Sequence, residues 1–423
     1  MAVTVKASKS ARFRSFLADF SLVDQPCLFS NEHSGNTRVT RLLAGGLEVP
    51  VFTNEFWTAR QRQASSIHEI SYRACYKPQL PRFSIELLTE PGDVVYDPFG
   101  GRGTTAIEAG LLGRRAVSND INPLSEILAR PRFFVPSITD VAERLQCIPR
   151  TPSVRAEIDL SMFYHPDTEA EIVGLRDYLN GRRADGSEDE LDAWIRMVAT
   201  NRLTGHSAGF FSVYTLPPNQ AVMPDRQVRI NEQRGQSPVY RDTSSIIVRK
   251  TGTLTAGLPK SDIDALRRCG ETVMFLCEHA RHTAAIPDDY VTLTVTSPPF
   301  LDVVQYATDN WLRCWFNDID VEDVSGRITM ARKLEAWSGF VEDVFRELHR
   351  ITEPSGWVAF EVGEVRGGRV RLEEHVIPAG VAAGLRCEGV LVNEQVFTKT
   401  ANIWGVSNNA KGTNSNRIVL FSK

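Results

Sequence analysis

The fold is decided by the stretch VVYDPFGGRGTT, residues 94–105. An apolar, β-branched segment ends in an acid, Asp97, and passes through a glycine-rich turn into an apolar segment that begins at Ala106. Strand, glycine turn and helix in this order open a nucleotide-type βαβ unit, in which glycine lets a ligand approach the backbone closely. The stretch therefore predicts an α/β fold with a ligand site at this turn.

A second acid follows the next short apolar stretch. Residues 115–119 (RAVSN) predict a second strand, and Asp120 closes it. It stands close to the offset of about 20 residues at which a carboxylate that binds ribose hydroxyls is expected. Asn122, just before Pro123, either assists in this site or forms a turn. The pair of acids strengthens the prediction of a site beyond what a glycine turn alone supports.

A third motif lies where the apolar run LTVT, residues 293–296, ends in Ser297-Pro298-Pro299-Phe300. A strand that stops at two prolines has no backbone donors there, so its last carbonyls can accept hydrogen bonds from a ligand. A hydroxyl precedes these carbonyls and an aromatic ring follows them. The corner fits a flat ring with an exocyclic amino group, and read alone it is equally well an ordinary strand-to-loop turn.

Together these motifs resemble the DNA amino-methyltransferases, which use S-adenosyl-L-methionine (SAM) to methylate exocyclic nitrogens of bases. DPFGGRGTT, residues 97–105, matches the cofactor motif of that family at every fixed position. TSPPF, residues 296–300, matches its catalytic motif in the Ser-Pro-Pro-aromatic form, and YKPQLP, residues 76–81, resembles the segment before its cofactor strand. The resemblance covers roughly 70–130 and 270–423.

The resemblance implies a fold and a domain organisation. The expected fold is α/β, a Rossmann-like SAM-dependent methyltransferase fold with a large, partly helical insertion. The expected divisions are an irregular N-terminal leader or arm at 1–65, a cofactor-binding half at 66–134, an inserted target-recognition region at 135–270, and a catalytic half at 271–423. Helical patterns at 169–179 and 188–203 interrupt the α/β alternation, which resumes near 271.

The resemblance also implies which residues bind SAM. They are Asp97, Phe99, Gly101, Gly103, Thr105, Asp120, Asn122 and Glu278. Asp97 and the glycine turn would meet the methionine portion, Asp120 the ribose, and Glu278 the adenine. Thr105 is also explained as a helix cap, and Asp120 as an exposed acid at a strand end.

The catalytic residues implied by the resemblance are Ser297, Pro298, Pro299 and Phe300. The Ser297 hydroxyl and the Pro298 carbonyl would accept hydrogen bonds from the amino group of the target base. This would aim the nitrogen lone pair at the methyl group, so positioning and electrostatics carry the reaction without a metal or a covalent nucleophile. Phe300 would stack on the base after it has left the duplex.

Sequence readout is expected from the insertion. Its predicted DNA-binding residues are Arg226, Arg229, Arg234 and Arg241. Arginine is the commonest reader of guanine, although a solvated loop explains the same charges. The implied partners are double-stranded DNA and, where such an enzyme is half of a restriction–modification pair, a cognate restriction endonuclease.

The composition of the chain limits the class of protein to which it can belong. At 423 residues, with 42% hydrophobic and 24% charged side chains, the chain has the make-up of a soluble globular protein with a sizeable core. No apolar run approaches the ~20 residues of a membrane span and residues 1–6 show no signal-peptide core, which predicts a cytoplasmic protein without a membrane partner. Seven scattered cysteines predict reduced thiols and no zinc site. The net charge of −4 requires any DNA-binding charge to be concentrated on one face.

The chemistry of the target base remains the open choice. The Ser-Pro-Pro form of the corner is commoner among cytosine-N4 enzymes, which favours methylation of cytosine N4. The cofactor motif precedes the catalytic motif, an order that is unusual for such enzymes and keeps adenine N6 as the alternative. Methylation of RNA is a third reading. A SAM-binding or DNA-binding module without catalysis is a fourth, although a purely structural role would not require the Pro-Pro corner.

Overall fold

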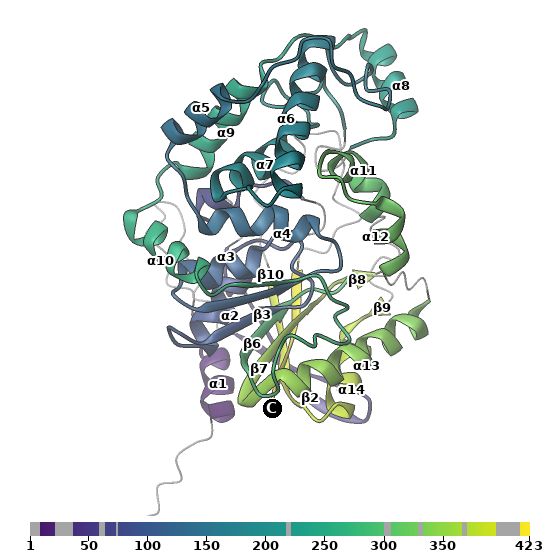
Figure 1. Ribbon diagram of the computed structural model, residues 1–423. Helices are drawn as coiled ribbons and strands as arrows, with labels where there is room; N and C mark the ends of the chain where they lie inside the picture. The colour runs from purple at the N-terminus through teal and green to yellow at the C-terminus, as the bar shows by residue number, and fades with distance from the viewer. Residues whose placement is uncertain are drawn as a thin grey trace, which may run out of the picture.

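The computed structural model describes residues 9–21, 37–58, 64–72, 75–216, 221–299, 306–328, 333–365, 370–394 and 415–423. Phe300, and the 217–220 segment beside the predicted DNA-binding arginines, lie outside them. Figure 1 shows two tiers, a lower one built around a β-sheet and an upper one of helices. The site described below lies where the two tiers meet.

Within the described residues, nine strands form one sheet in the order β1-β2-β10-β11-β7-β6-β3-β4-β5. The strands are β1 (Arg38–Ala44), β2 (Leu47–Asn54), β3 (Val94–Asp97), β4 (Arg115–Asn119), β5 (Met274–Leu276), β6 (Val291–Thr296), β7 (Thr352–Val362), β10 (Arg386–Glu394) and β11 (Ser415–Ser422). Strands β3 to β7 pair in parallel, whereas β11 runs antiparallel between β7 and β10. This doubly wound order confirms the predicted Rossmann-like α/β fold.

Successive side chains of the central strands enter two separate cores. Val95 belongs to the core shared with the helices α2 (Gln79–Leu88) and α3 (Thr104–Leu111), whereas Val94 and Tyr96 belong to the core on the opposite face. That second core is covered by α13 (Leu334–Ile351) and α14 (Glu373–Ala382). Because both faces are covered, side chains on both sides of the central strands are buried, including two of the threonines that alternate with valine and leucine in β6.

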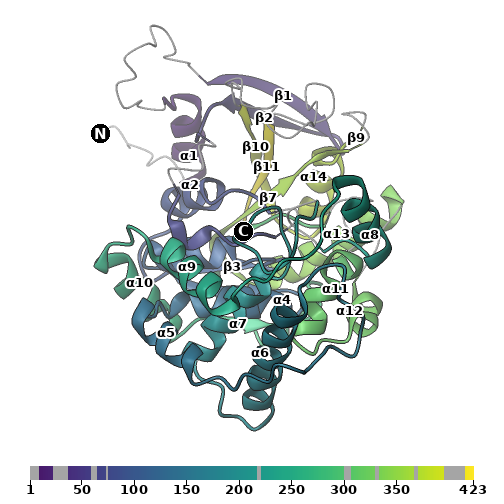
Figure 2. The ribbon, with the colours of Figure 1, turned by 90° about the horizontal axis from the view of Figure 1, so that it is seen from above.

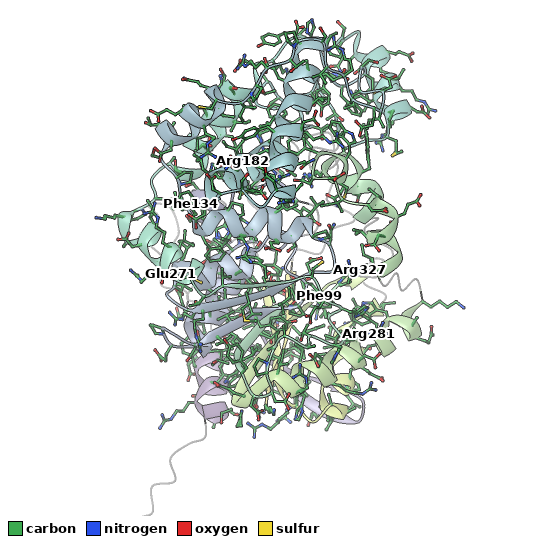
Figure 3. The ribbon with its side chains drawn as sticks, viewed as in Figure 1. Phe99, Phe134, Arg182, Glu271, Arg281 and Arg327 are labelled. Atoms are coloured by element: carbon green, nitrogen blue, oxygen red, sulfur yellow. The ribbon has the colours of Figure 1, made fainter. Side chains whose placement is uncertain are left out.

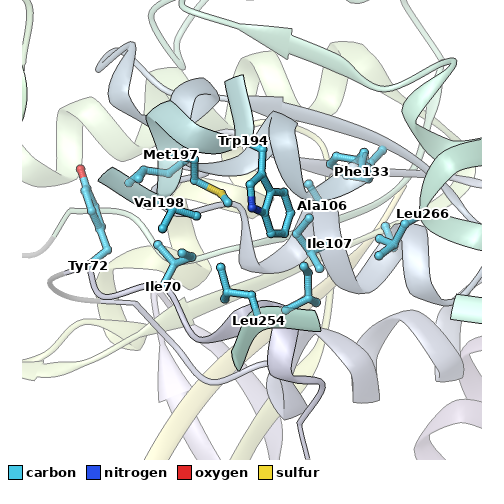
Figure 4. Packing of buried hydrophobic residues seen from close by; sticks show 14 of the residues in the cluster. Ile70, Tyr72, Ala106, Ile107, Phe133, Trp194, Met197, Val198, Leu254 and Leu266 are labelled. Carbon is cyan, nitrogen blue, oxygen red and sulfur yellow. The ribbon is translucent and has the colours of Figure 1, made fainter. Parts of the chain in front are cut away.

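The upper tier is formed by the insertion. Its helices are α5 (Ile138–Gln146), α6 (Pro166–Ala184), α7 (Glu190–Arg202), α8 (Pro224–Arg234), α9 (Thr243–Thr255) and α10 (Lys260–Gly270). Figure 4 shows Trp194 and Val198 of α7 with Leu254 of α9 packed together with Ile107 of α3. The insertion therefore shares a hydrophobic core with the cofactor-binding half, and the target-recognition role of this region stays a prediction.

The expectation of an irregular leader is wrong for residues 9–18 and 38–54. Residues 9–18 form α1 (Lys9–Ala18), whose Phe13 ring lies 4.8 Å from that of Trp357. Strands β1 and β2 form a hairpin, and β2 pairs in parallel with β10 at the edge of the sheet (Figure 2). The hairpin was missed because β1, as an edge strand, is mostly exposed and carries polar side chains that conceal its pattern.

Short elements complete the surroundings of the site. They are η2 (Ser66–His68), α4 (Leu124–Ala129), η3 (Arg130–Phe133), α11 (Tyr306–Phe316), α12 (Val321–Arg327) and the small hairpin of β8 (Glu364–Val365) and β9 (Val370–Arg371). The helices α11 and α12 follow the Pro-Pro corner along the chain and flank the insertion in Figure 1. In the described part of the chain, no helix has both the length and the apolar character needed to cross a membrane.

Candidate active site

One pocket joins the glycine turn to the Pro-Pro corner at the carboxyl ends of β3, β4 and β6. Seven of the residues singled out in the sequence line it, namely Phe99, Gly101, Asp120, Asn122, Glu278, Ser297 and Pro299. Figure 3 shows Phe99 and Arg327, another lining residue, near the level at which the two tiers meet. Carboxyl ends of parallel strands are the usual place for ligands in this class of fold.

Asp120 is held in place by the backbone. Its two carboxylate oxygens accept hydrogen bonds from the amides of Gly101, at 2.8 Å, and Asn122, at 2.9 Å. Gly101 has a φ of +52°, a left-handed conformation that glycine adopts without strain. Each oxygen keeps a second lone pair, so the carboxylate can still accept bonds from a pair of ligand hydroxyls.

Burial raises the pKa of Asp120 to about 6, while the two backbone amides oppose this shift and the nearby Asp97 adds to it. The carboxylate is therefore charged at neutral pH but lies much closer to titration than an exposed aspartate. A ligand that donates hydrogen bonds to both oxygens would favour the charged form.

The pocket wall beside Asp120 carries buried polar atoms without partners. Glu278 Oε2 and Asn122 Nδ2 are buried and make no hydrogen bond. The backbone of Glu278 is fixed because its amide donates to Asn119 Oδ1, at 2.9 Å, and its carbonyl accepts from Asn119 Nδ2, at 3.0 Å. Buried polar groups are nearly always paired, so an acceptor and a donor held here indicate a site for a polar ligand.

Aromatic side chains form another part of the pocket wall. The ring centroids of Phe99 and Phe340 lie 6.0 Å apart, and the imidazole of His279 lies 5.9 Å from Phe340. Phe340 was not singled out in the sequence because an aromatic residue on a helix is usually a core residue, and His279 was passed over in favour of the acid before it. The combination of flat apolar walls and a few fixed polar atoms suits a heteroaromatic ring.

Asp97 lies beneath the pocket and does not line it. Its carboxylate accepts hydrogen bonds from the Tyr76 hydroxyl and the Thr296 hydroxyl, each at 2.7 Å. The Thr105 hydroxyl is within hydrogen-bonding reach of both the Tyr76 oxygen and the Val295 carbonyl, at 3.2 Å from the latter, and donates to one of them at a time. Burial raises the pKa of Asp97, and these hydroxyls lower it. Asp97 and Thr105 thus join the cofactor strand to the catalytic strand, and Tyr76, a residue of the pocket wall, connects them.

Gly103 is required by packing. It adopts a left-handed φ of +77°, and a Cβ placed on it would lie 2.4 Å from the Cβ of Ala129 on α4. Any side chain at this position would push the glycine turn away from α4. The amide of Leu124, the first residue of α4, donates to Asn122 Oδ1. The structure therefore places Gly103 behind the pocket wall.

The Pro-Pro corner presents Ser297 and Pro299 to the pocket, with Pro298 buried between them. Its carbonyls are not all open, since Trp337 Nε1 donates to the Pro299 carbonyl at 3.0 Å. This bond anchors the corner to α13 from outside the sheet.

Glu361 is the main site residue that the sequence did not reveal. It lies at the carboxyl end of β7, where its carboxylate accepts a hydrogen bond from Asn416 Nδ2 at 2.6 Å and lies close enough to the Ser297 hydroxyl for that group to lower its pKa. Burial raises the pKa of Glu361, and the two donors oppose the shift. The available signal was an acid inside the apolar strand WVAFEV, residues 357–362, where a buried carboxylate needs a function or a partner.

The four predicted DNA-binding arginines lie outside this pocket, in and after α8. Arg241 Nη1 donates to the carbonyls of Ser207 and Phe210, each at 2.8 Å, and the guanidinium of Arg234 lies over the Tyr214 ring at 3.8 Å. These two side chains hold the insertion together. Arg226 and Arg229 are exposed on α8, at the upper right of Figure 1.

Comparison with known proteins identifies one part of the chain. Residues 35–128 match the family model described as DNA methylase. The type II methyltransferase M.BsoBI of Geobacillus stearothermophilus is 32% identical over 90 residues, which are 21% of this chain and 18% of that protein. The chain thus matches less than a fifth of the length of this curated relative.

Solved structures align more weakly. A candidate DNA modification methylase of Thermus thermophilus, TTHA0409, in complex with S-adenosyl-L-methionine, is 22% identical over 34% of this chain and 52% of that chain, with a TM-score of 0.22. TrmN of Thermus thermophilus is 13% identical over 86% of this chain and 52% of that chain, with a TM-score of 0.32.

Proposed function

We propose that the protein is a SAM-dependent DNA methyltransferase that modifies the N4 nitrogen of cytosine, on the premise that residues 35–128 match the family model described as DNA methylase. The observation that carries the proposal is the pocket that is lined both by Asp120, held by the glycine turn, and by Ser297 of the Pro-Pro corner. These residues are far apart in sequence, and the two motifs meet only in the fold.

The pocket fits SAM. Asp120 offers two oxygens for the ribose hydroxyls, and the aromatic wall to which Phe99 and Phe340 contribute suits the adenine. The unpartnered Glu278 Oε2 and Asn122 Nδ2 supply an acceptor and a donor for polar groups of the cofactor. When bound, SAM supplies an electrophilic methyl group and requires no metal.

The protein's own groups prepare the nitrogen that attacks this methyl group. The amino nitrogen of cytosine is a poor nucleophile because its lone pair is conjugated with the ring. Ser297 donates its hydroxyl hydrogen to Glu361, which leaves its oxygen lone pairs free to accept a hydrogen bond from the amino group. The Pro298 carbonyl is the second acceptor. These bonds favour a pyramidal nitrogen and hold it in place, so positioning lowers the barrier.

Glu361 also accounts for the proton that the nitrogen loses as the new bond to carbon forms. Its carboxylate is reached through the Ser297 hydroxyl, and its raised pKa makes it a better proton acceptor than an exposed glutamate. The target base has to leave the duplex to reach this corner, because its amino group lies inside a base pair.

Digestion of treated DNA tests the proposal. The purified protein is incubated with SAM and mixed-sequence duplex DNA, and the nucleosides are separated by mass spectrometry, with RNA as a parallel substrate and Ser297→Ala as the control. The proposal expects N4-methylcytosine in DNA. N6-methyladenine would show that the target base is adenine and that the type of reaction is as proposed. Methylation confined to RNA would show that the substrate is RNA and not DNA. The absence of any methylated nucleoside would support a binding module without catalysis.

A further inference from the structure

A second cavity lies beside the pocket, between the cofactor-binding half and the insertion. Its walls come from residues 64–72, from the glycine turn, and from α7 and α9 of the insertion. Tyr72 lines both this cavity and the candidate active site, and Arg102 follows Gly101 of the pocket wall directly. The cavity is called the basic cleft below and is defined by Ser65, His68, Glu69, Arg102, Arg202 and Lys250.

Three cations of the basic cleft come from three separate segments. Lys250 of α9 is 9% exposed, and its Nζ lies 3.8 Å from Glu69 Oε2. Arg202 of α7 is also 9% exposed; it bonds to the backbone and side-chain oxygens of Asn201 and lies over the Phe210 ring at 3.9 Å. Arg102 donates to the carbonyl of Ile70 at 2.8 Å. Among the lining residues that the structure describes, Glu69 is the single carboxylate facing these cations.

This arrangement leaves positive charge uncompensated in a half-buried space. Burial lowers the pKa of Lys250 to about 8, and Arg202 lowers it further. Burial likewise lowers the pKa of Arg202 to about 10, with the charge of Arg313 adding to the shift. Buried charges are costly unless they are paired, so an anion in the basic cleft would stabilise all of them.

Hydrogen-bonding groups are also left open in the basic cleft. His68 is 4% exposed; its Nε2 contacts Glu108 Oε1 at 2.6 Å, whereas its Nδ1 has no partner. The buried hydroxyl of Ser65 has no partner either. The Ser65 hydroxyl can donate to an anionic oxygen, whereas His68 Nδ1 can do so only in the imidazolium form, which burial disfavours by lowering the pKa of His68.

The basic cleft is preformed. Its α7 and α9 walls share a hydrophobic core with the cofactor-binding half, in which Val198 and Leu254 lie near Ile70 (Figure 4). The Ser66 hydroxyl donates to the carbonyls of Leu254, at 2.9 Å, and Ala256, at 2.8 Å, which ties η2 to the end of α9. A ligand would therefore meet cations already held in place.

We propose that the basic cleft binds a backbone phosphate of the nucleic-acid substrate, beside the nucleotide whose base enters the active site. This inference rests on the proposed function. Arginine and lysine pair with phosphodiester oxygens, and such contacts fix the position of a polynucleotide without reading its sequence. The shared Tyr72 wall puts the anion next to the target base, where a polynucleotide necessarily carries phosphates.

Two neighbouring residues on α9 provide a matched pair of variants. Lys250→Gln removes the charge inside the basic cleft, and Arg249→Gln removes the same charge from an exposed position next to it. DNA binding is measured by fluorescence anisotropy at several salt concentrations. Lys250→Gln is expected to weaken binding about tenfold and to reduce the slope of log Kd against log salt by about one phosphate contact. Arg249→Gln is expected to change neither quantity, and Lys250→Arg is expected to restore both.

DNA in which neutral methylphosphonates replace the phosphates that flank the target nucleotide tests whether the anion in the basic cleft is a backbone phosphodiester. The methylphosphonates should weaken binding to the wild-type protein but not to Lys250→Gln. Equal effects on both proteins would contradict a phosphodiester in the basic cleft. If inorganic phosphate raises the Tm of the wild-type protein, and the Lys250→Gln change abolishes this rise but leaves DNA binding unaltered, the cleft is a free-anion site and the inference is wrong.

The failure of the inference is distinguishable from failure of the proposed function. If the wild-type protein methylates DNA while Lys250→Gln and Arg249→Gln bind DNA alike, the inference fails and the function stands. If the wild-type protein binds and methylates no nucleic acid, both fail. Calorimetric SAM affinity and the unfolding curve of each variant show whether a loss of DNA binding comes from misfolding.

Discussion

The hydroxyl of Ser297 lies close enough to the carboxylate of Glu361, on the neighbouring strand β7, to lower the pKa that burial raises. The pair brings the hydroxyl of the Pro-Pro corner next to a buried acid. In the proposed reaction this acid provides a destination for a proton that leaves the reacting nitrogen. The pair is therefore the part of the site on which the chemistry most depends.

Glu361→Gln should lower kcat about tenfold or more, with SAM affinity unchanged, because glutamine keeps the shape of the side chain but accepts no proton. The wild-type rate should also fall at acid pH, as Glu361 becomes protonated at its raised pKa. The variant should lose this acid limb in kcat at saturating SAM, where the weaker cofactor binding predicted on protonation of Asp120 does not enter. Steady-state kinetics across pH check both effects, and the exposed Glu374→Gln is the matched control. If the acid limb persists unchanged in Glu361→Gln, a group other than Glu361 causes it.

Ser297→Ala removes one proposed acceptor of the amino group and leaves the Pro298 carbonyl. The rate of methyl transfer should fall by about tenfold to a thousandfold, or about 1.4–4 kcal/mol. Single-turnover measurements with saturating SAM and DNA isolate this step. A variant as fast as the wild type would show that the hydroxyl takes no part in the reaction.

Asp120→Ala should weaken SAM binding by about 1–3 kcal/mol, the scale of a lost hydrogen bond to a charged group. Because the pKa of Asp120 is raised to about 6, the wild-type affinity should be full above that value. It should fall as the pH drops through it, when the carboxylate gains a proton. Titration calorimetry at several pH values measures this. A wild-type pH dependence that survives in Asp120→Ala would remove Asp120 from the site.

The arginines of the insertion should separate into two kinds. Arg241→Ala should lower the Tm, since its guanidinium holds the carbonyls of Ser207 and Phe210. Arg226→Ala and Arg229→Ala should leave the Tm unchanged and should weaken DNA binding, with a smaller salt slope for a phosphate contact or relaxed specificity for a base contact. Unchanged affinity, salt slope and target choice in both exposed variants would place the DNA surface elsewhere.

The sequence predicted well what depends on local pattern. The turn after Asp97 and the acid at Asp120 follow from spacing along one βαβ unit, because strand, turn and helix are local structures. The central strands could be located because burial on both faces enriches them in apolar and β-branched residues. The edge strand β1 could not, since its exposed face carries polar residues.

The rest depends on contacts between distant segments. Gly101 and Gly103 look alike in the motif, yet Gly101 lines the pocket, whereas Gly103 makes room for Ala129. The proposed role of Glu361 depends on its position beside Ser297, and the proposed role of Lys250 depends on its position beside Arg202. Nothing in the sequence gives the pairing of β7 with β6 or the seating of α9 against η2, so these residues could not be found from motifs.

The measurement that tests the central claim most directly is nucleoside analysis of DNA methylated by the purified protein with SAM. The account predicts N4-methylcytosine, formed by the wild-type protein and strongly reduced in Ser297→Ala. The pocket presents acceptors to an amino group, and burial raises the pKa of the thiol of Cys75 in its wall, which disfavours the nucleophilic thiolate. The appearance of 5-methylcytosine, or of no methylated nucleoside at all, would therefore contradict the account.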